Sequence, residues 1–199
     1  TRSALDFIDR HHDRNVARGT DDPFFLYFAP PAPHDPVTPP ADMLGVPIRG
    51  ATGLGPRADM VYQNDVSLGL LLDALDERGL TDDTLVLFLS DNGGVRPDPA
   101  ELDAGHDKHG GLRGHKSEIW EGGARTPLVA MWGDGTPAGS VIPPGSTSSQ
   151  LVAVHDLAAT LAAVVGENLP TDQARESHDI LPVLTGSQPP GVPVRAWYV

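Results

Sequence analysis

The stretch TLVLFLSDNGG, residues 84–94, decides the fold class of this chain. After Thr84 its apolar residues follow one another without polar alternation, which is typical of a strand covered on both faces. This strand runs directly into SDNGG, residues 90–94, so polar side chains and two glycines gather where it ends. Since ligands of open α/β sheets bind beyond the carboxyl ends of the strands, this junction is a candidate site.

Two further apolar runs predict buried strands: FFLYF at residues 24–28 and PLVAMW at residues 127–132. Apolar residues at helical spacing predict helices, each followed by a glycine, over residues 3–16, 60–78 and 156–165. Strands that alternate with helices predict an α/β fold in which a largely parallel sheet is flanked by helices. Because no linker divides the sequence, we expect residues 1–199 to lie in a single domain.

The chain is rich in loop-forming residues, with 20 Pro and 22 Gly. Residues 30–56 predict a long ordered loop with few core residues and with His34 near its start, and residues 95–116 predict a second loop rich in Gly and His. The last residues, 196–199, have the composition of a strand. The helix over residues 60–78 is expected to bury an apolar stripe, which consists of Val61, Leu68, Leu72 and Leu75 and also carries Asp65.

Charge and composition exclude several classes of function. A formal net charge of -13 and the lack of any Lys/Arg cluster argue against a nucleic-acid partner. With no Cys there is no disulfide, no thiolate nucleophile and no cysteine-based metal site. No apolar run approaches the roughly 20 residues of a membrane span, and the first ten residues do not have the pattern of a signal peptide.

Four residues are candidates for chemistry. Asp91 and Asn92 offer adjacent carboxylate and amide oxygens, which suit a hard cation such as Ca²⁺ or Mg²⁺, although two ligands do not complete its shell. Taken alone, Ser-Asp-Asn-Gly favours a turn over a metal site. Lys116 by itself fits a solvated surface lysine, and His34 fits a loop histidine bonded to nearby carbonyls.

The order of the motifs resembles that of the type I sulfatases, which belong to the alkaline phosphatase superfamily. PFFLYF followed by PHDP, residues 23–28 and 33–36, resembles the family's strand and its Pro-His-x-Pro loop. Asp65 and Gly69 resemble an Asp-x-x-x-Gly helix, and SDNGG resembles the metal-binding turn. LRGHK and WEGGARTP, residues 112–116 and 120–127, resemble the family's Lys-then-Glu-Gly-Gly block, and VHDL and ILPVLTG, residues 154–157 and 180–186, are similar to its later structural segments.

This resemblance implies a site and a reaction. Asp91 and Asn92 would ligate Ca²⁺ or Mg²⁺, while His34 and Lys116 would be catalytic and substrate-binding residues that contact a sulfate ester, all four in one cleft. The fold would be an incomplete alkaline-phosphatase-like core, and the family suggests a periplasmic or extracellular location.

The sequence departs from the family at its beginning. The acidic metal-binding pair and the Cys- or Ser-x-Pro-x-Arg motif that yields the formylglycine nucleophile are absent, and so are a second lysine and a second histidine of the family's site. Residues 1–199 are therefore expected to be the C-terminal part of a sulfatase catalytic domain, without the nucleophile or the small C-terminal subdomain. The missing N-terminal part would be needed to complete the site.

Three alternatives remain open. The chain could belong to a phosphatase or phosphonate monoester hydrolase of the same superfamily, because a metal and fixed cations serve phosphoryl transfer equally well. His106, His109 and His115 could together bind zinc. Finally, the chain could be a non-catalytic fragment whose unpaired sheet edges promote association.

Overall fold

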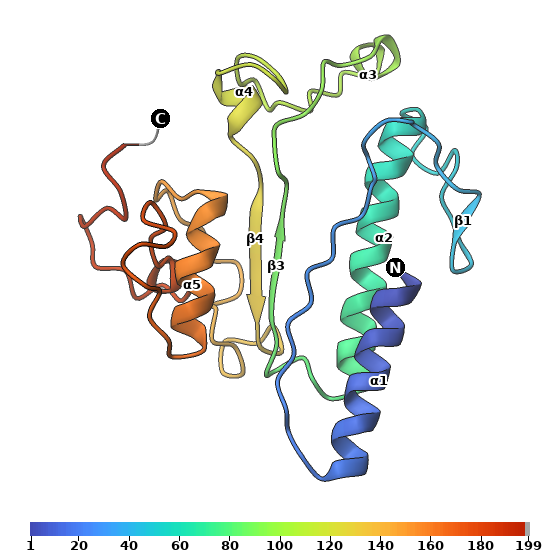
Figure 1. Cartoon of the computed structure of the whole chain (residues 1–199). Helices are drawn as coiled ribbons and strands as arrows, with labels where there is room; N and C mark the ends of the chain where they lie inside the picture. The colour runs from blue at the N-terminus through green and yellow to red at the C-terminus, as the bar shows by residue number, and fades with distance from the viewer. Residues whose placement is uncertain (198–199) are drawn as a thin grey trace. The chain divides into compact units, whose positions relative to one another are not determined.

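The computed structural model describes residues 1–197 (Figure 1). The chain divides into two compact units, one made of Thr1–Thr81 and Gly94–Gly123, the other of Asp82–Gly93 and Ala124–Val199. The strand predicted at residues 196–199 lies partly outside the described residues. No helix in the described part of the chain is both long and apolar enough to cross a bilayer.

Two long helices, both predicted, are the largest elements of the first unit. Helix α1 (Arg2–Arg18) ends at Gly19, whose φ of 63° lets the chain turn sharply out of the helix. Helix α2 (Pro56–Glu77) packs beside it, as Figure 1 shows. The hydroxyls of Thr1 and Ser67 lie 2.8 Å apart, and Arg78 donates a 2.9 Å hydrogen bond to the carboxylate of Asp9.

The stripe predicted for α2 is wrong by a rotation of about one residue. Val61 is 54% exposed and Asp65 is exposed, while Leu68 and Leu72 are only partly buried. Apart from Asp59, the buried residues of α2 are Met60, Ser67, Leu71 and Leu75. The apolar residues of this helix are spread around most of its surface, so helical spacing alone did not decide which face lies inward.

The strand predicted at residues 24–28 does not form as expected. The segment belongs to no sheet in the described structure, and Phe25 and Tyr27 are 70% and 82% exposed. Phe24, by contrast, packs edge-on against the rings of Phe7 and His11 on α1. A strand is buried on both faces only when it lies in a sheet whose two faces are covered, usually by helices, and this segment lies in no described sheet.

The loop predicted over residues 30–56 contains a small hairpin, β1 (Asp42–Met43) and β2 (Val46–Pro47), and more core than expected. Ile48 is fully buried. Asp59, 3% exposed in the first turn of α2, accepts hydrogen bonds from the Gly50 N–H at 2.7 Å and from the Thr52 hydroxyl at 2.7 Å. This buried carboxylate fixes the loop to the helix.

The second stretch of this unit begins with the short helix α3 (Pro99–Asp103). Asp98 and Glu101 form a capping box, each accepting the backbone N–H of the other. Glu101 is 3% exposed and its carboxylate pairs with the ammonium of Lys108. A single turn of helix, α4 (Glu121–Ala124), ends the stretch.

The second unit contains both predicted central strands, but not in the predicted arrangement. β3 (Leu85–Leu89) and β4 (Leu128–Trp132) pair antiparallel, with Leu85 opposite Trp132 and Leu89 opposite Leu128. Both sheets described within residues 1–197 are two-stranded and antiparallel, so the largely parallel sheet is not confirmed. The stretch between β3 and β4 holds only one-turn helices, α3 and α4, which supply no crossover helix of the kind that joins parallel strands.

The rest of this unit is organised by a buried carboxylate. The predicted third helix is present as η1 (Val154–Asp156) and α5 (Leu157–Val164), and α6 (Leu181–Leu184) follows. Asp156 has no exposed surface; it accepts the N–H groups of Ala153 and His178, and it pairs with Arg195. It therefore ties the segment VHDL, residues 154–157, to the stretch just before ILPVLTG, residues 180–186.

Replacing Asp156 with Ala is expected to destabilise the chain by about 3 kcal/mol, because the buried guanidinium of Arg195 would lose its carboxylate and the N–H groups of Ala153 and His178 would lose their acceptor. Urea unfolding followed by tryptophan fluorescence would measure this. The matched control is Asp172→Ala, an exposed carboxylate whose loss should change stability by less than about 0.5 kcal/mol. Equal urea midpoints for the two variants would contradict the assigned role.

Asp59 predicts a pH-dependent contribution to stability. The Gly50 N–H, followed by the hydroxyl and N–H of Thr52, lowers the pKa of Asp59 below its ordinary value of 3.8, against the opposing effect of burial. A lowered folded-state pKa gives stability that is present above the unfolded pKa and is lost as pH falls through the folded pKa. The difference in urea midpoint between the wild type and Asp59→Asn should therefore be largest above about pH 5 and shrink toward about pH 2. A difference independent of pH would contradict this.

Candidate functional site

His34 presents one ring nitrogen to its surroundings. It lies in an exposed turn, and its Nδ1 is 3.0 Å from the carbonyl oxygen of Asp35. Because a carbonyl can only accept, Nδ1 carries the proton of this bond, and in the neutral ring Nε2 then holds a lone pair. No residue between 1 and 197 bonds to Nε2, so this atom is open to a ligand.

Two residues of α2 hold the turn that carries His34. Arg57 donates from one nitrogen to the carbonyl of Pro33 at 2.7 Å and from another to the carboxylate of Asp35 at 2.9 Å. Asn64, two helical turns further on, donates to the carbonyl of Ala32 at 2.8 Å. The residues on both sides of His34 are thus fixed to one face of one helix.

The sequence did not point to Arg57 or Asn64 as functional. Their spacing of seven residues puts both on one face of α2, which is the only signal that the sequence offered. Their partners are backbone carbonyls and an acidic side chain more than twenty residues away, and no motif records such contacts.

Asp91 and Asn92 lie in a bend immediately after β3. The Ser90 hydroxyl donates to the carbonyl of Asn92 at 2.9 Å, which closes the bend, and Gly93 is buried behind it. The turn alternative is therefore correct for the backbone. It does not exclude metal binding, because the exposed Asp91 carboxylate has no hydrogen-bonding partner in the part of the chain that the structure describes.

Lys116 is fixed through its backbone while its ammonium stays unpaired. Its N–H donates to the carbonyl of Gly94 at 2.8 Å, and its own carbonyl accepts from Nδ1 of His115 at 2.9 Å. The side chain is partly buried, yet no acceptor within residues 1–197 bonds to its ammonium. A point charge held in this way is suited to an anionic ligand.

The two glycines of WEGGARTP close the Lys116 loop. The Gly122 N–H donates to the carbonyl of Arg113 at 2.8 Å, and a Cβ on Gly122 would lie 2.2 Å from the carbonyl oxygen of Gly114. A Cβ on Gly123 would lie 2.2 Å from the carbonyl oxygen of Glu118. Backbone packs on backbone here, so no other residue fits at either position.

The structure brings His34 and Lys116 into one compact unit and assigns Asp91 and Asn92 to the other. The convergence of all four residues on one cleft stays a prediction. Within the described chain no group of three or more His, Cys, Asp or Glu side chains is arranged to hold a metal. Asp91 and Asn92 fit a hard cation in the chemistry of their oxygens, as two ligands of a larger shell.

The zinc hypothesis receives no support from the geometry. His109 directs Nε2 at the carbonyl of Gly94, at 3.0 Å, while Nε2 of His115 faces the guanidinium of Arg96 and the carboxylate of Glu118. His106 is exposed. The rings of His109 and His115 bond different partners, and the three histidines form no cluster among the residues described.

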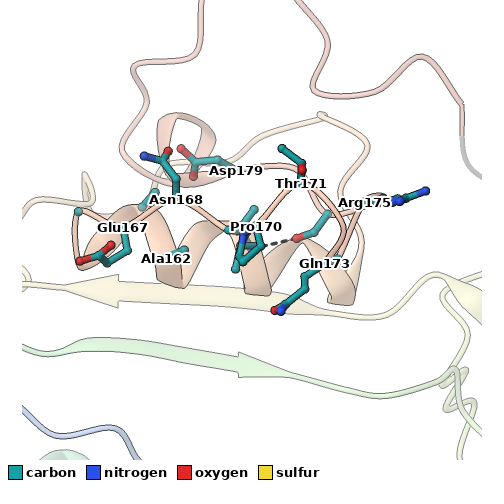
Figure 2. Close-up of a pocket in the computed structure, with 14 residues that line it drawn as sticks. Ala162, Glu167, Asn168, Pro170, Thr171, Gln173, Arg175 and Asp179 are labelled. Carbon is teal, nitrogen blue, oxygen red and sulfur yellow. Dashed lines mark hydrogen bonds between the residues drawn. The ribbon is translucent and has the colours of Figure 1, made fainter.

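A hollow of about 590 Å³ in the second unit, between α5 and the loop after it, is shown in Figure 2. Glu167, Asn168, Arg175 and Asp179 supply polar groups to its lining, and all four residues are exposed. None of the predicted site residues lines this hollow. Exposed side chains of both charges give it no fixed set of ligand donors.

Comparison with known proteins agrees with the motif order. The Sulfatase family model matches residues 3–167. N-acetylgalactosamine-6-sulfatase of Mus musculus is 35% identical over 192 residues, which cover 94% of this chain and 32% of that protein. N-acetylgalactosamine-6-O-sulfatase of Bacteroides thetaiotaomicron is 34% identical over 191 residues, with 94% of this chain and 34% of that protein covered.

The fold is also similar to that of a solved protein. The crystal structure of Ps i-CgsB superposes on this chain with a TM-score of 0.72 at 30% sequence identity. The match covers 95% of this chain and 38% of the Ps i-CgsB chain. The chain thus spans about a third of the length of the curated relatives it matches.

Replacing Arg57 with Ala is expected to release the turn that carries His34, because two of its three anchors to α2 come from this guanidinium. Backbone ¹⁵N relaxation should show the order parameters of His34 and Asp35 falling from about 0.85 to below about 0.6. Arg2→Ala, which removes an exposed cation at the start of α1, is the control. Unchanged order parameters in Arg57→Ala would refute the anchoring role.

Proposed function

This chain belongs to the sulfatase family, and on that basis we propose that it supplies sulfate-binding and metal-binding residues to an enzyme that hydrolyses sulfate esters. The observation that carries the proposal is the state of Lys116. A cation with its backbone bonded at both the N–H and the carbonyl, and with an unpaired ammonium, is prepared to receive an anion.

Sulfuryl transfer places charge on the peripheral oxygens and on the leaving oxygen, and fixed donors stabilise that charge because they need no reorganisation. We assign the peripheral oxygens to the ammonium of Lys116. His34 contributes Nε2, the ring nitrogen that Asp35 leaves open. In its protonated form the imidazole donates a proton to the departing oxygen.

Asp91 and Asn92 would hold a Ca²⁺ or Mg²⁺ ion with their side-chain oxygens. Such an ion, when bound, neutralises charge on the sulfate oxygens. What supports this assignment is the exposed carboxylate of Asp91, which has no protein partner within residues 1–197, on a bend that the Ser90 hydroxyl stabilises. The two residues fill only part of the shell of either cation, so further ligands must complete it.

The 199 residues contain no Cys and no Ser-x-Pro-x-Arg sequence, so we assign no nucleophile among them. We therefore expect these residues by themselves to show no turnover. The relatives named for N-acetylgalactosamine 6-sulfate make that sugar ester the natural substrate to assay beside an aryl sulfate.

The test is hydrolysis of p-nitrophenyl sulfate by the protein encoded by the complete reading frame that carries these residues. We expect hydrolysis that Ca²⁺ or Mg²⁺ supports and EDTA abolishes. Lys116→Ala should lower kcat/KM by about 10²- to 10³-fold, as the loss of one donor to transition-state charge does elsewhere. Arg175→Ala, which removes an exposed cation from the other unit, is the matched control.

Three outcomes would contradict the proposal. The complete protein could hydrolyse p-nitrophenyl phosphate and not the sulfate, which would favour a phosphatase. Lys116→Ala could equal the wild type, which would remove Lys116 from the site. Clear turnover by the 199 residues alone would show that they contain a nucleophile that the motifs do not reveal.

A further inference from the structure

We infer that His109 is a positioning residue for Lys116, acting through the carbonyl of Gly94. The inference rests on the proposed role of Lys116 and deepens it. The three residues lie in one compact unit, and two hydrogen bonds connect them: one of 2.8 Å from the Lys116 N–H to the Gly94 oxygen and one of 3.0 Å from Nε2 of His109 to the same oxygen.

The Gly94 carbonyl is a shared acceptor, and both of its lone pairs are used. Because a carbonyl only accepts, His109 must carry its proton on Nε2, so the ring acts here as a donor. When only one donor holds a carbonyl, the peptide unit that contains it can still tilt. Held by two donors from different parts of the loop, it fixes the point at which the Lys116 backbone is attached.

The His109 ring is itself held in place. Its side chain is only 8% exposed, so water has little access to replace a lost hydrogen bond. The backbone N–H of His109 donates to one oxygen of Asp107 at 2.9 Å, and the N–H of Gly111 donates to the other at 2.6 Å. These two bonds, in that order of effect, lower the pKa of the Asp107 carboxyl, so this anchor is ionised at neutral pH.

The absence of a side chain at Gly94 leaves space for the stem of Lys108 beside it. A Cβ at this position would lie 3.1 Å from the Lys108 stem and 3.4 Å from Nε2 of His109. Lys108 cannot move away freely, because its ammonium pairs with the buried carboxylate of Glu101. The second glycine of SDNGG therefore leaves room for the Lys108 stem, while the His109 ring would lie at an ordinary contact distance from a Cβ there.

The role differs from direct contact with substrate. The side chain of His109 is nearly buried, and its Nε2 is already bonded to the carbonyl of Gly94. The Lys116 ammonium, in contrast, has no acceptor within residues 1–197. His109 thus affects an anion only through the placement of Lys116. A structural role elsewhere in the fold would act on stability without depending on Lys116.

The first test uses the 199-residue chain. Hydrogen exchange of the Lys116 amide, read residue by residue by NMR, should become about tenfold faster in His109→Leu, which fills the space but donates nothing. His109→Gln places an amide N–H close to the position of Nε2 and should retain most of the protection. His106→Leu, an exposed histidine of the same loop, should exchange like the wild type. Unchanged exchange in His109→Leu, or equal loss in His109→Gln, would overturn the inference.

The second test is a double-mutant cycle in the protein encoded by the complete reading frame, with p-nitrophenyl sulfate as substrate. His109→Leu should lower kcat/KM about tenfold when Lys116 is present and less than about twofold in a Lys116→Ala background. Equal losses in both backgrounds would show that His109 does not act through Lys116. If no variant, including the wild type, hydrolyses the sulfate, the proposed function fails, while the exchange measurement still decides the positioning role.

Discussion

The carbonyl oxygen of Gly94 is the constraint on which the placement of Lys116 depends. It accepts the Lys116 N–H and the His109 ring, and so closes a loop of more than twenty residues onto the end of SDNGG. Loops have little core of their own, and a charged side chain on an untied loop would lose its placement to conformational entropy. Here the Gly94 carbonyl, with its two donors, holds the loop in place of a core. The ammonium of Lys116 takes no part in these bonds.

The same device recurs where other loops meet helices. Buried carboxylates bind backbone N–H groups on distant segments, Asp59 in the first unit and Asp156 in the second. In the turn that carries His34 the side chain is the donor: Arg57 donates to the backbone carbonyl of Pro33. In a chain with many Pro and Gly residues, side chains that satisfy backbone groups do the work that sheet ladders do in more regular folds.

Periodicity predicted the elements whose evidence is local. Helices α1, α2 and α5 and strands β3 and β4 formed where apolar spacing and a closing glycine placed them. The parallel sheet and the buried strand at residues 24–28 were not confirmed. How a strand pairs and what covers its faces depend on the segments packed against it, and an apolar run does not specify those segments. The inward face of α2 was misjudged for the same reason.

The sequence by itself determined the residue types available for chemistry and the order in which they occur, and that order was enough to identify the family. Their roles could be named because a carboxylate-amide pair, a lysine and a histidine have fixed chemical capacities. Only the tertiary structure decided that His109 bonds the carbonyl of Gly94, and that Arg57 and Asn64 hold the His34 turn. A side-chain bond to a distant backbone carbonyl leaves no pattern in the sequence, because every residue offers the same carbonyl and only the fold selects one.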